Sequence, residues 1–337
     1  MKLTRIFVPL VASMVLYSCA SNNLSYEGKA FKNAYASIKA EELKKNLSVI
    51  ASDEMQGRDT GSEGQKKAGQ YMINFYKNIG VSYPKALGSY YQTVPKEALK
   101  SRGKELPESE NILAFIEGTE KPEEIIVVSA HYDHVGTKDG VVYNGADDDG
   151  SGTVAVMEIA EAFQQAKKAG KGPKRSILFL HVTGEEHGLL GSKYYADHPV
   201  FDMKNTLVDL NIDMIGRSDK ENEGKNYVYV IGSEMLSSEL KVINEAANKI
   251  THNLELNYKY DDPKDPMRLY YRSDHYNFAK SGVPVAFYFD GIHADYHQPT
   301  DDVDKIDFPL LQKRAQLVFA TAWELANRKD RIVVDKK

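Results

Sequence analysis

The segment YNGADDDGSGTVAVME, residues 143–158, places three carboxylates in succession, at Asp147, Asp148 and Asp149. Neighbouring like charges repel each other, so such a run is typical of a place where water or a cation surrounds it. Glycines on both sides of the run give the backbone the freedom to turn sharply. By itself the segment therefore predicts either a solvated acidic turn or a cation site.

A calcium loop is one interpretation of the acidic segment. Positions 1, 3, 5, 6, 8 and 12 of an EF-hand loop are matched by Asp147, Asp149, Ser151, Gly152, Val154 and Glu158. An EF-hand also needs a helix that enters the loop. The preceding stretch HVGTKDGVVYNGA contains three glycines and two adjacent valines, which disfavour a helix. The EF-hand is therefore the weaker cation interpretation.

Other apolar runs of the chain also lead to residues that can bind a metal. They are VVSAHYDH with His131 and Asp133, FLHVTGEEHG with Glu185 and Glu186, LNIDMIG with Asp213, and YFDGIHADYH, which leads to His297. Short runs rich in Val, Ile and Phe are typical of buried parallel strands, whose carboxyl ends form one ligand-binding edge. So many carboxylates are stable together at a partly buried edge only when cations neutralise them. We expect bound cations there, with the acidic loop supplying a ligand.

Local geometry divides the tasks within these motifs. On an extended strand end His131 and Asp133 share a face, so one can bind metal while the other holds its partner's side chain. His134 would point the other way, and we expect it to pack or to form a hydrogen bond. Glu185 and Glu186 are adjacent and diverge, so one can bind metal while the other acts as general base.

Motifs of other hydrolases are missing from the sequence. It contains no His-Glu-x-x-His, and HVTGEEH does not match the inverted motif, because Glu185 follows His181 by four positions rather than three. Ser151 does not lie in Gly-x-Ser-x-Gly, because Asp149 stands two positions before it. A serine hydrolase is therefore poorly supported.

The elements that must position these residues follow an α/β pattern from Ala40 onward. Ser62 and Gln65 form a capping-box pattern, and Gly80 stands where the glycine after a helix belongs. Further helices are expected near 152–169, 236–252 and 308–328, between the apolar runs. No linker divides the chain between 40 and 330. We predict a single three-layer domain, in which helices flank a mainly parallel twisted sheet and the metal site lies at the carboxyl ends of the strands.

Taken in order, six motifs resemble the family of co-catalytic zinc aminopeptidases that also contains the glutamate carboxypeptidases and the zinc glutaminyl cyclases. The motifs are HYD, NGADDDGSG, TGEEHGLLGS, NIDMIGR, SDHYNFAKSGVPV and DYHQPTD. The resemblance runs from about Leu47 to about Ala326. It implies a dinuclear zinc exopeptidase in which a water or hydroxide between the two ions attacks the peptide bond. Ligands of this kind suit Zn²⁺ and also Mn²⁺ or Co²⁺.

The resemblance also implies a role for each matching residue. The ligands would be His131, Asp148 and Asp213 for one ion and Asp148, Glu186 and His297 for the other. Asp148 would bridge the ions, because the family's bridging aspartate directly precedes the Asn or Asp of Asp-[Asn/Asp]-x-Ser-Gly, here Asp149. Glu185 would be the general base, Asp133 the partner of His131, and Tyr296 a group that stabilises the oxyanion.

Two other activities in the family have to be weighed. In the glutaminyl cyclases a tryptophan precedes the final histidine, an aspartate precedes the Asp-His pair, and a histidine follows the Gly-Val-Pro strand. Tyr296, Ser273 and Phe287 stand at these positions here, which favours the peptidase. A carboxypeptidase remains an alternative, although the short segment 90–110 leaves a minimal enzyme, for which aminopeptidase is the commoner activity. A binding lipoprotein without activity would be expected to lack a ligand or the base, and none is missing.

The choice of substrate is not readable from the sequence. Arg58, Arg217, Arg268 and Arg272 could each face a substrate carboxylate or pair with surface acids, and pairing is the simpler expectation for each. We expect peptides as substrates and a monomeric protein. The formal net charge of −5 disfavours nucleic acid as a partner.

The beginning of the chain carries a targeting pattern. Lys2 and Arg5 precede an apolar run of about 12 residues, shorter than the roughly 20 that a membrane-spanning helix needs, which indicates a secretory signal. Cys19, the only cysteine, ends LYSC, which resembles a bacterial lipobox. Cleavage near Ser21 without lipid is the alternative.

These patterns define the expected domain boundaries. Residues 1–18 would be a lipoprotein signal peptide, residues 19–39 a spacer that begins with lipidated Cys19, and residues 40–330 the zinc peptidase domain. Such a protein would be anchored by lipid in a bacterial cell envelope and would face the periplasm or the exterior.

Overall fold

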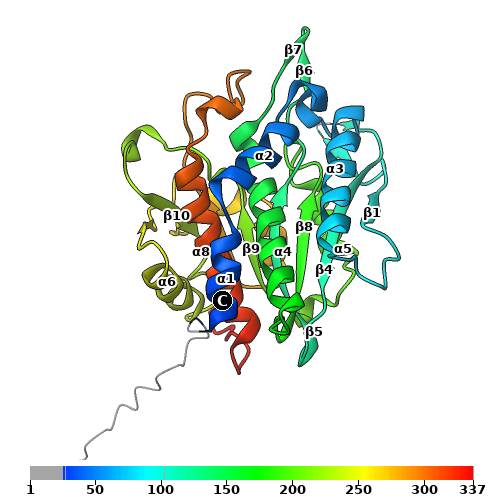
Figure 1. Ribbon diagram of the computed structural model, residues 1–337. Helices are drawn as coiled ribbons and strands as arrows, with labels where there is room; N and C mark the ends of the chain where they lie inside the picture. The colour runs from blue at the N-terminus through cyan, green and yellow to red at the C-terminus, as the bar shows by residue number, and fades with distance from the viewer. Residues whose placement is uncertain (1–25, 27, 102, 337) are drawn as a thin grey trace, which may run out of the picture.

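The structure is a computed structural model that describes residue 26 and residues 28–101 and 103–336 (Figure 1). In this part of the chain a mixed eight-stranded sheet has the order β1-β4-β8-β5-β9-β12-β10-β11. The strands are β1 (Tyr91–Val94), β4 (Ser109–Ile116), β8 (Arg175–Val182), β5 (Lys121–His131), β9 (Thr206–Ile212), β12 (Val285–Phe289), β10 (Tyr227–Ile231) and β11 (Glu255–Asn257). The four central strands β8, β5, β9 and β12 run parallel.

Helices cover both faces of the sheet, which confirms the predicted three-layer α/β domain. Side chains of β5 alternate between the two faces: Ile126 and Val128 join one apolar cluster, whereas Ile125 and Val127 join the other. The first cluster packs under α1 (Lys29–Ser37), α2 (Ala40–Ile50), α3 (Glu63–Ile79), α4 (Gly152–Lys168), α6 (Leu240–Ile250) and α8 (Phe308–Asn327), and the second under α5 (Leu190–Asp197) and α7 (His275–Lys280). In Figure 1, α4 and α8 lie in front of the sheet.

The expected helix ends are observed on α3. The Ser62 side chain accepts a hydrogen bond from the Gln65 backbone N–H, and Gly80 ends the helix in the left-handed conformation with φ of 80°. Glycine adopts this conformation without a steric penalty, whereas other residues rarely do. Helices α4, α6 and α8 match the three ranges predicted further along the chain.

Part of the predicted spacer belongs to the folded domain. Residues 29–37 form α1, whose Phe31 is buried and stacks on Phe319 of α8 at 5.9 Å between ring centroids. The spacing of Phe31 and Ala34 places both on one face of the helix, a signal too short to predict a helix from sequence. The predicted signal peptide and Cys19 lie outside the described residues. Within the described ranges, no helix is both long and apolar enough to cross a bilayer.

Arg58 is buried and connects several loops near the end of β5. Its guanidinium donates hydrogen bonds of 2.7–2.9 Å to the backbone carbonyls of Ile50, Tyr132, Asn144 and Gly145. These carbonyls lie after β5, at the end of α2 and just before the acidic segment. Arg58 is fully buried and engaged by these carbonyls, so it serves the fold and is not placed to bind a substrate.

We expect Arg58→Gln to lower the free energy of unfolding by about 3 to 5 kcal/mol, because it leaves several buried carbonyls without their donor. Urea unfolding followed by circular dichroism measures this difference. Arg268→Gln is the matched control: Arg268 is exposed, and its loss should change stability by less than about 1 kcal/mol. Equal unfolding midpoints for Arg58→Gln and the unchanged protein would contradict the bracing role.

Candidate metal centre

The residues singled out in the sequence meet at the carboxyl ends of the central strands. His131 is the last residue of β5, Asp213 directly follows β9, and Glu185 lies three positions after β8. Asp148 lies in the irregular turn Ala146–Ser151 that leads into α4, and His297 lies in the loop after β12. The parallel strands thus place side chains from distant parts of the sequence at one edge, as the strand pattern predicts.

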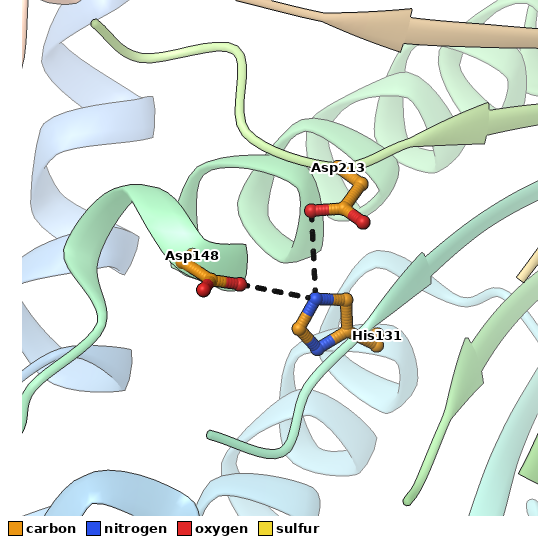
Figure 2. A group of neighbouring side chains, drawn as sticks. All are labelled: His131, Asp148 and Asp213. Carbon is orange, nitrogen blue, oxygen red and sulfur yellow. Dashed lines mark ion pairs between the residues drawn. The ribbon is translucent and has the colours of Figure 1, made fainter. Parts of the chain in front are cut away.

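One group of possible ligands consists of His131, Asp148 and Asp213 (Figure 2). The Nε2 atom of His131 lies 3.2 Å from Oδ1 of Asp148 and 3.5 Å from Oδ1 of Asp213. The other ring nitrogen, Nδ1, lies 3.0 Å from the carbonyl oxygen of Asp133 and 3.7 Å from its carboxylate. This contact turns Nε2 toward the two carboxylates, the usual arrangement around a ligand imidazole.

Asp213 has a partner of its own. Ser273 donates a hydrogen bond of 2.6 Å to Oδ2 of Asp213 and accepts one from the side chain of Asn211. The serine therefore holds one carboxylate oxygen and leaves Oδ1 to face His131. Ser273 thus places an uncharged hydroxyl donor beside Asp213.

A second group lies on the other side of Asp148. The Nε2 atom of His297 lies 3.0 Å from both Oδ2 of Asp148 and Oε2 of Glu186. Since Oδ1 of Asp148 faces His131, the two oxygens of this carboxylate are divided between the two groups. A carboxylate shared in this way is the arrangement that a bridging ligand requires.

His134 is a member of the site that the sequence analysis did not identify. Its Nδ1 lies 2.9 Å from Oε1 of Glu186 and 3.8 Å from Oδ2 of Asp148, and the ring is fully buried. His134, Asp148 and Glu186 thus form an alternative set of ligands for an ion on this side of Asp148. The strand alternation that would turn His134 away ends at His131, where β5 ends. The sequence does not show where β5 ends, so it could not predict which way His134 faces.

The residues fit a pair of divalent cations. Nε2 of His131, Oδ2 of Asp148, Oε1 of Glu186 and both ring nitrogens of His134 are buried without a hydrogen-bond partner among the described residues. Their contacts have ion-pair distances but not hydrogen-bond geometry. Buried polar atoms are rarely left unsatisfied unless a water or an ion completes them. Converging imidazole nitrogens and carboxylate oxygens, without sulfur, are donors that suit Zn²⁺.

The protonation equilibria reflect the same crowding of charge. Burial by itself would lower the pKa of His131, but the carboxylates of Asp213, Asp133 and Asp148 raise it well above its usual value. Burial by itself would raise the pKa of Asp148, whereas the imidazoles of His131 and His297 hold it well below its usual range. The carboxylates and imidazoles therefore lie close enough to shift each other's pKa in opposite directions.

Glu185, Tyr296 and Asp133 surround the two groups. Glu185 and Tyr296 line one pocket together with Asp148 and Asp213. Burial raises the pKa of Glu185 well above its usual value, and the carboxylate of Glu186 adds to the rise. Burial also raises the pKa of Tyr296, so its hydroxyl stays protonated and can donate a hydrogen bond. Asp133 accepts hydrogen bonds from Thr60 and from the backbone N–H of Glu185.

The acidic segment is neither a solvated turn nor a calcium loop. Asp147, Asp148 and Asp149 are all buried. Asp147 accepts a hydrogen bond from the Gly216 backbone and lies against His293. Glu158, which an EF-hand would need at position 12, instead accepts a hydrogen bond from Asn46 of α2.

Asp149 ties the surroundings of the site together. Its carboxylate accepts hydrogen bonds from the backbone N–H groups of His131, Gly152 and Met214. These groups belong to the end of β5, the start of α4 and the residue after Asp213. One side chain therefore connects the three segments that carry the first group of ligands.

Comparisons with known proteins agree on one family. The model of peptidase family M28 matches residues 111–322. A probable leucine aminopeptidase of Arthroderma otae is 30% identical over 222 residues, which are 64% of this chain and 57% of that protein. The chain thus spans little more than half the length of this curated relative.

Solved structures show the same fold. The LapA aminopeptidase of Legionella pneumophila has a TM-score of 0.70 at 18% identity, over 97% of this chain and 81% of that one. The glutaminyl cyclase of Porphyromonas gingivalis has a TM-score of 0.64 at 20% identity, over 84% of this chain and 97% of that one. At such identities the likeness extends to the fold alone.

The structure distinguishes the aspartates of the acidic segment. Asp148→Asn should lose at least one bound divalent ion per chain, because it removes charge from the position between the two groups. Asp149→Asn should retain more metal but unfold about 1 to 3 kcal/mol more easily, because three buried backbone N–H groups lose carboxyl oxygens as acceptors. Elemental analysis and urea unfolding of both variants measure these effects. An Asp148→Asn protein with unchanged metal content would show that this carboxylate does not bridge two ions.

Proposed function

Because the chain belongs to peptidase family M28, we propose that it is a metallo-aminopeptidase that removes N-terminal residues from peptides with two Zn²⁺ ions. The observation that carries this proposal is the division of the Asp148 carboxylate between His131 and His297. It gives two adjacent cation positions beside a partly buried glutamate. Mn²⁺ or Co²⁺ would suit the same donors.

The contacts support a specific set of ligands. His131, Asp148 and Asp213 would hold one ion, and Asp148, Glu186 and His297 the other. His297 is preferred over His134 for the second ion, because its Nε2 is equally close to Asp148 and Glu186. His134 faces the opposite oxygen of Glu186, where it would orient that ligand.

The remaining residues account for hydrolysis. When bound, the two ions would polarise the scissile carbonyl and acidify a water molecule. The Glu185 carboxylate would take the proton from the attacking water and deliver it to the nitrogen of the leaving amine. The Tyr296 hydroxyl would donate a hydrogen bond to the developing oxyanion. Asp133 would hold the imidazole of His131 in place from its Nδ1 side.

Glutaminyl cyclisation is the second candidate, because a cyclase shares this fold. Ser273 and Tyr296 differ from the cyclase pattern, and two groups of ligands exceed what one ion would need. Incubating the metal-loaded protein with peptides that begin with glutamine or leucine separates the activities. Release of the first residue supports an aminopeptidase, formation of pyroglutamate supports a cyclase, and release of the last residue supports a carboxypeptidase.

Glu185→Gln should reduce hydrolysis by about 10² to 10⁴, the range typical of a lost general acid–base group. Metal content should stay unchanged, because the proposed ligands are intact. Glu186→Gln is the matched comparison and should lose metal together with activity. If Glu185→Gln loses metal and Glu186→Gln retains it, the two roles have to be exchanged.

We further propose that lipid on Cys19 anchors the protein to a bacterial envelope membrane. The support is the sequence alone: a basic start, a short apolar run and LYSC. At least two acyl chains would be needed, since one gives only marginal membrane binding.

Cys19→Ser should therefore move the protein into the soluble fraction or block its processing. Fractionation and intact mass measure both effects. Ser21→Ala is the control and should remain with the membrane. Unchanged mass and unchanged membrane association of Cys19→Ser would exclude the lipid anchor.

A further inference from the structure

A small pocket adjoins the metal centre, and one arginine side chain lines it. Asp148, Asp213 and Glu185 form its inner side, and Leu269, Phe287 and Phe289 contribute apolar walls. Arg272 also lines this pocket. The pocket therefore combines a surface for methylene groups with a guanidinium beside the proposed reaction site.

The structure separates Arg272 from the other arginines considered above. Arg58 is buried among backbone carbonyls, Arg217 pairs with Asp295 at 2.9 Å, and the Arg268 guanidinium lies 4.9 Å from the centre of the Tyr271 ring. The arginine ion pairs of the described chain involve Arg175, Arg217, Arg314, Arg328 and Arg331. Arg272 is exposed and has no carboxylate partner among the described residues.

The backbone places Arg272 firmly relative to the metal centre. Its N–H donates a hydrogen bond to the carbonyl oxygen of Leu269, which closes the short turn Leu269–Tyr271. The next residue, Ser273, donates its hydroxyl to Asp213. One peptide bond therefore separates the arginine from a residue that touches a proposed ligand, so the backbone of Arg272 lies close to the metal centre.

Two cavities of different size lie beside the adjacent pair Glu185 and Glu186. The pocket with Arg272 offers about 40 Å³, whereas the cavity lined by Glu186, His187 and Lys138 offers about 460 Å³. The smaller pocket suits one side chain, and the larger cavity suits the rest of a peptide. In an aminopeptidase the pocket beside Glu185 would thus receive the side chain of the first residue.

We propose that Arg272 binds the side-chain carboxylate of an N-terminal glutamate or aspartate, so that the enzyme favours peptides that begin with an acidic residue. This inference rests on the proposed aminopeptidase function. The apolar walls would cover the methylene groups, and the guanidinium would pair with both carboxylate oxygens through its planar fork. An uncharged side chain of the same shape would form only weaker hydrogen bonds there.

The p-nitroanilides of glutamate and glutamine test the proposal, because they have the same shape and differ in charge. The ratio of their kcat/KM values in the zinc-loaded full chain should be on the order of 10 to 100 in favour of glutamate. In Arg272→Gln this ratio should fall to about 1, and Arg272→Lys should retain part of it, since lysine keeps the charge without the fork. Arg268→Gln is the matched control and should keep the full ratio.

A ratio of 1 or below in the unchanged protein, or an unchanged ratio in Arg272→Gln, would overturn the proposal. Leucine p-nitroanilide distinguishes this failure from failure of the proposed function: its hydrolysis without a glutamate preference removes only the role of Arg272. If none of the substrates is hydrolysed, both proposals fall.

Two further measurements show which carboxylate of the substrate Arg272 binds. Calorimetry should show that free L-glutamate binds more tightly than L-glutamine, and that Arg272→Gln abolishes the difference. Leu-Gly and its C-terminal amide should be cleaved with equal kcat/KM. A preference for the free C-terminus that disappears in Arg272→Gln would place the guanidinium on the leaving side and overturn the proposal.

Discussion

The structure depends on keeping several carboxyl groups close together where water has little access. Asp148 is 3% exposed, yet it lies within 3.2 Å of one imidazole and 3.0 Å of another. Charge in such surroundings has to be matched by positive charge or by hydrogen-bond donors. The chain uses both: imidazoles converge on Asp148, and backbone N–H groups converge on Asp147 and Asp149.

The sheet makes this arrangement possible because its central strands are parallel. Their carboxyl ends lie at one edge. The residues at and just after the ends of β5, β8 and β9 are therefore close together in space. Asp149 then connects two of these ends directly, through the backbone N–H groups of His131 and Met214. Arg58 adds a second connection, between the last carbonyl of α2 and the carbonyl that follows β5. The hydrogen bonds of Arg58 and Asp149 thus stabilise the loops at this edge of the sheet.

Much of this arrangement could be predicted from the sequence because it follows short-range patterns. Short, continuous apolar runs indicate the parallel strands, and the position of His131 and Asp213 at strand ends implies that they meet. The structure brings the eight predicted site residues to one edge. The division of Asp148 between two groups could be predicted only through the family resemblance, not from the local sequence pattern. The position of His134 beside Glu186 could not be predicted, since it depends on the residue at which β5 ends.

The unpredicted features share a physical cause, which is that they depend on contacts between distant segments. Phe31 has a partner 288 positions away in α8, at Phe319, and nothing in the local sequence of α1 indicates it. The four arginines look alike in sequence. Only the folded chain shows that Arg58 is buried among carbonyls, that Arg217 forms an ion pair and that Arg268 stacks on a ring, whereas Arg272 lines a pocket and has no carboxylate partner among the described residues. Short motifs therefore identify ligands better than they identify substrate-binding residues.

The proposed metal ions and the proposed role of Arg272 depend on each other through charge. Without cations, the guanidinium shares its pocket with Asp148, Asp213 and Glu185, and these carboxylates would repel an acidic substrate side chain. Two divalent ions would neutralise the carboxylates that bind them and leave the guanidinium as positive charge available to the substrate. Recognition of an acidic side chain therefore requires the ions as much as the arginine, so the same cations would serve both hydrolysis and the choice of substrate.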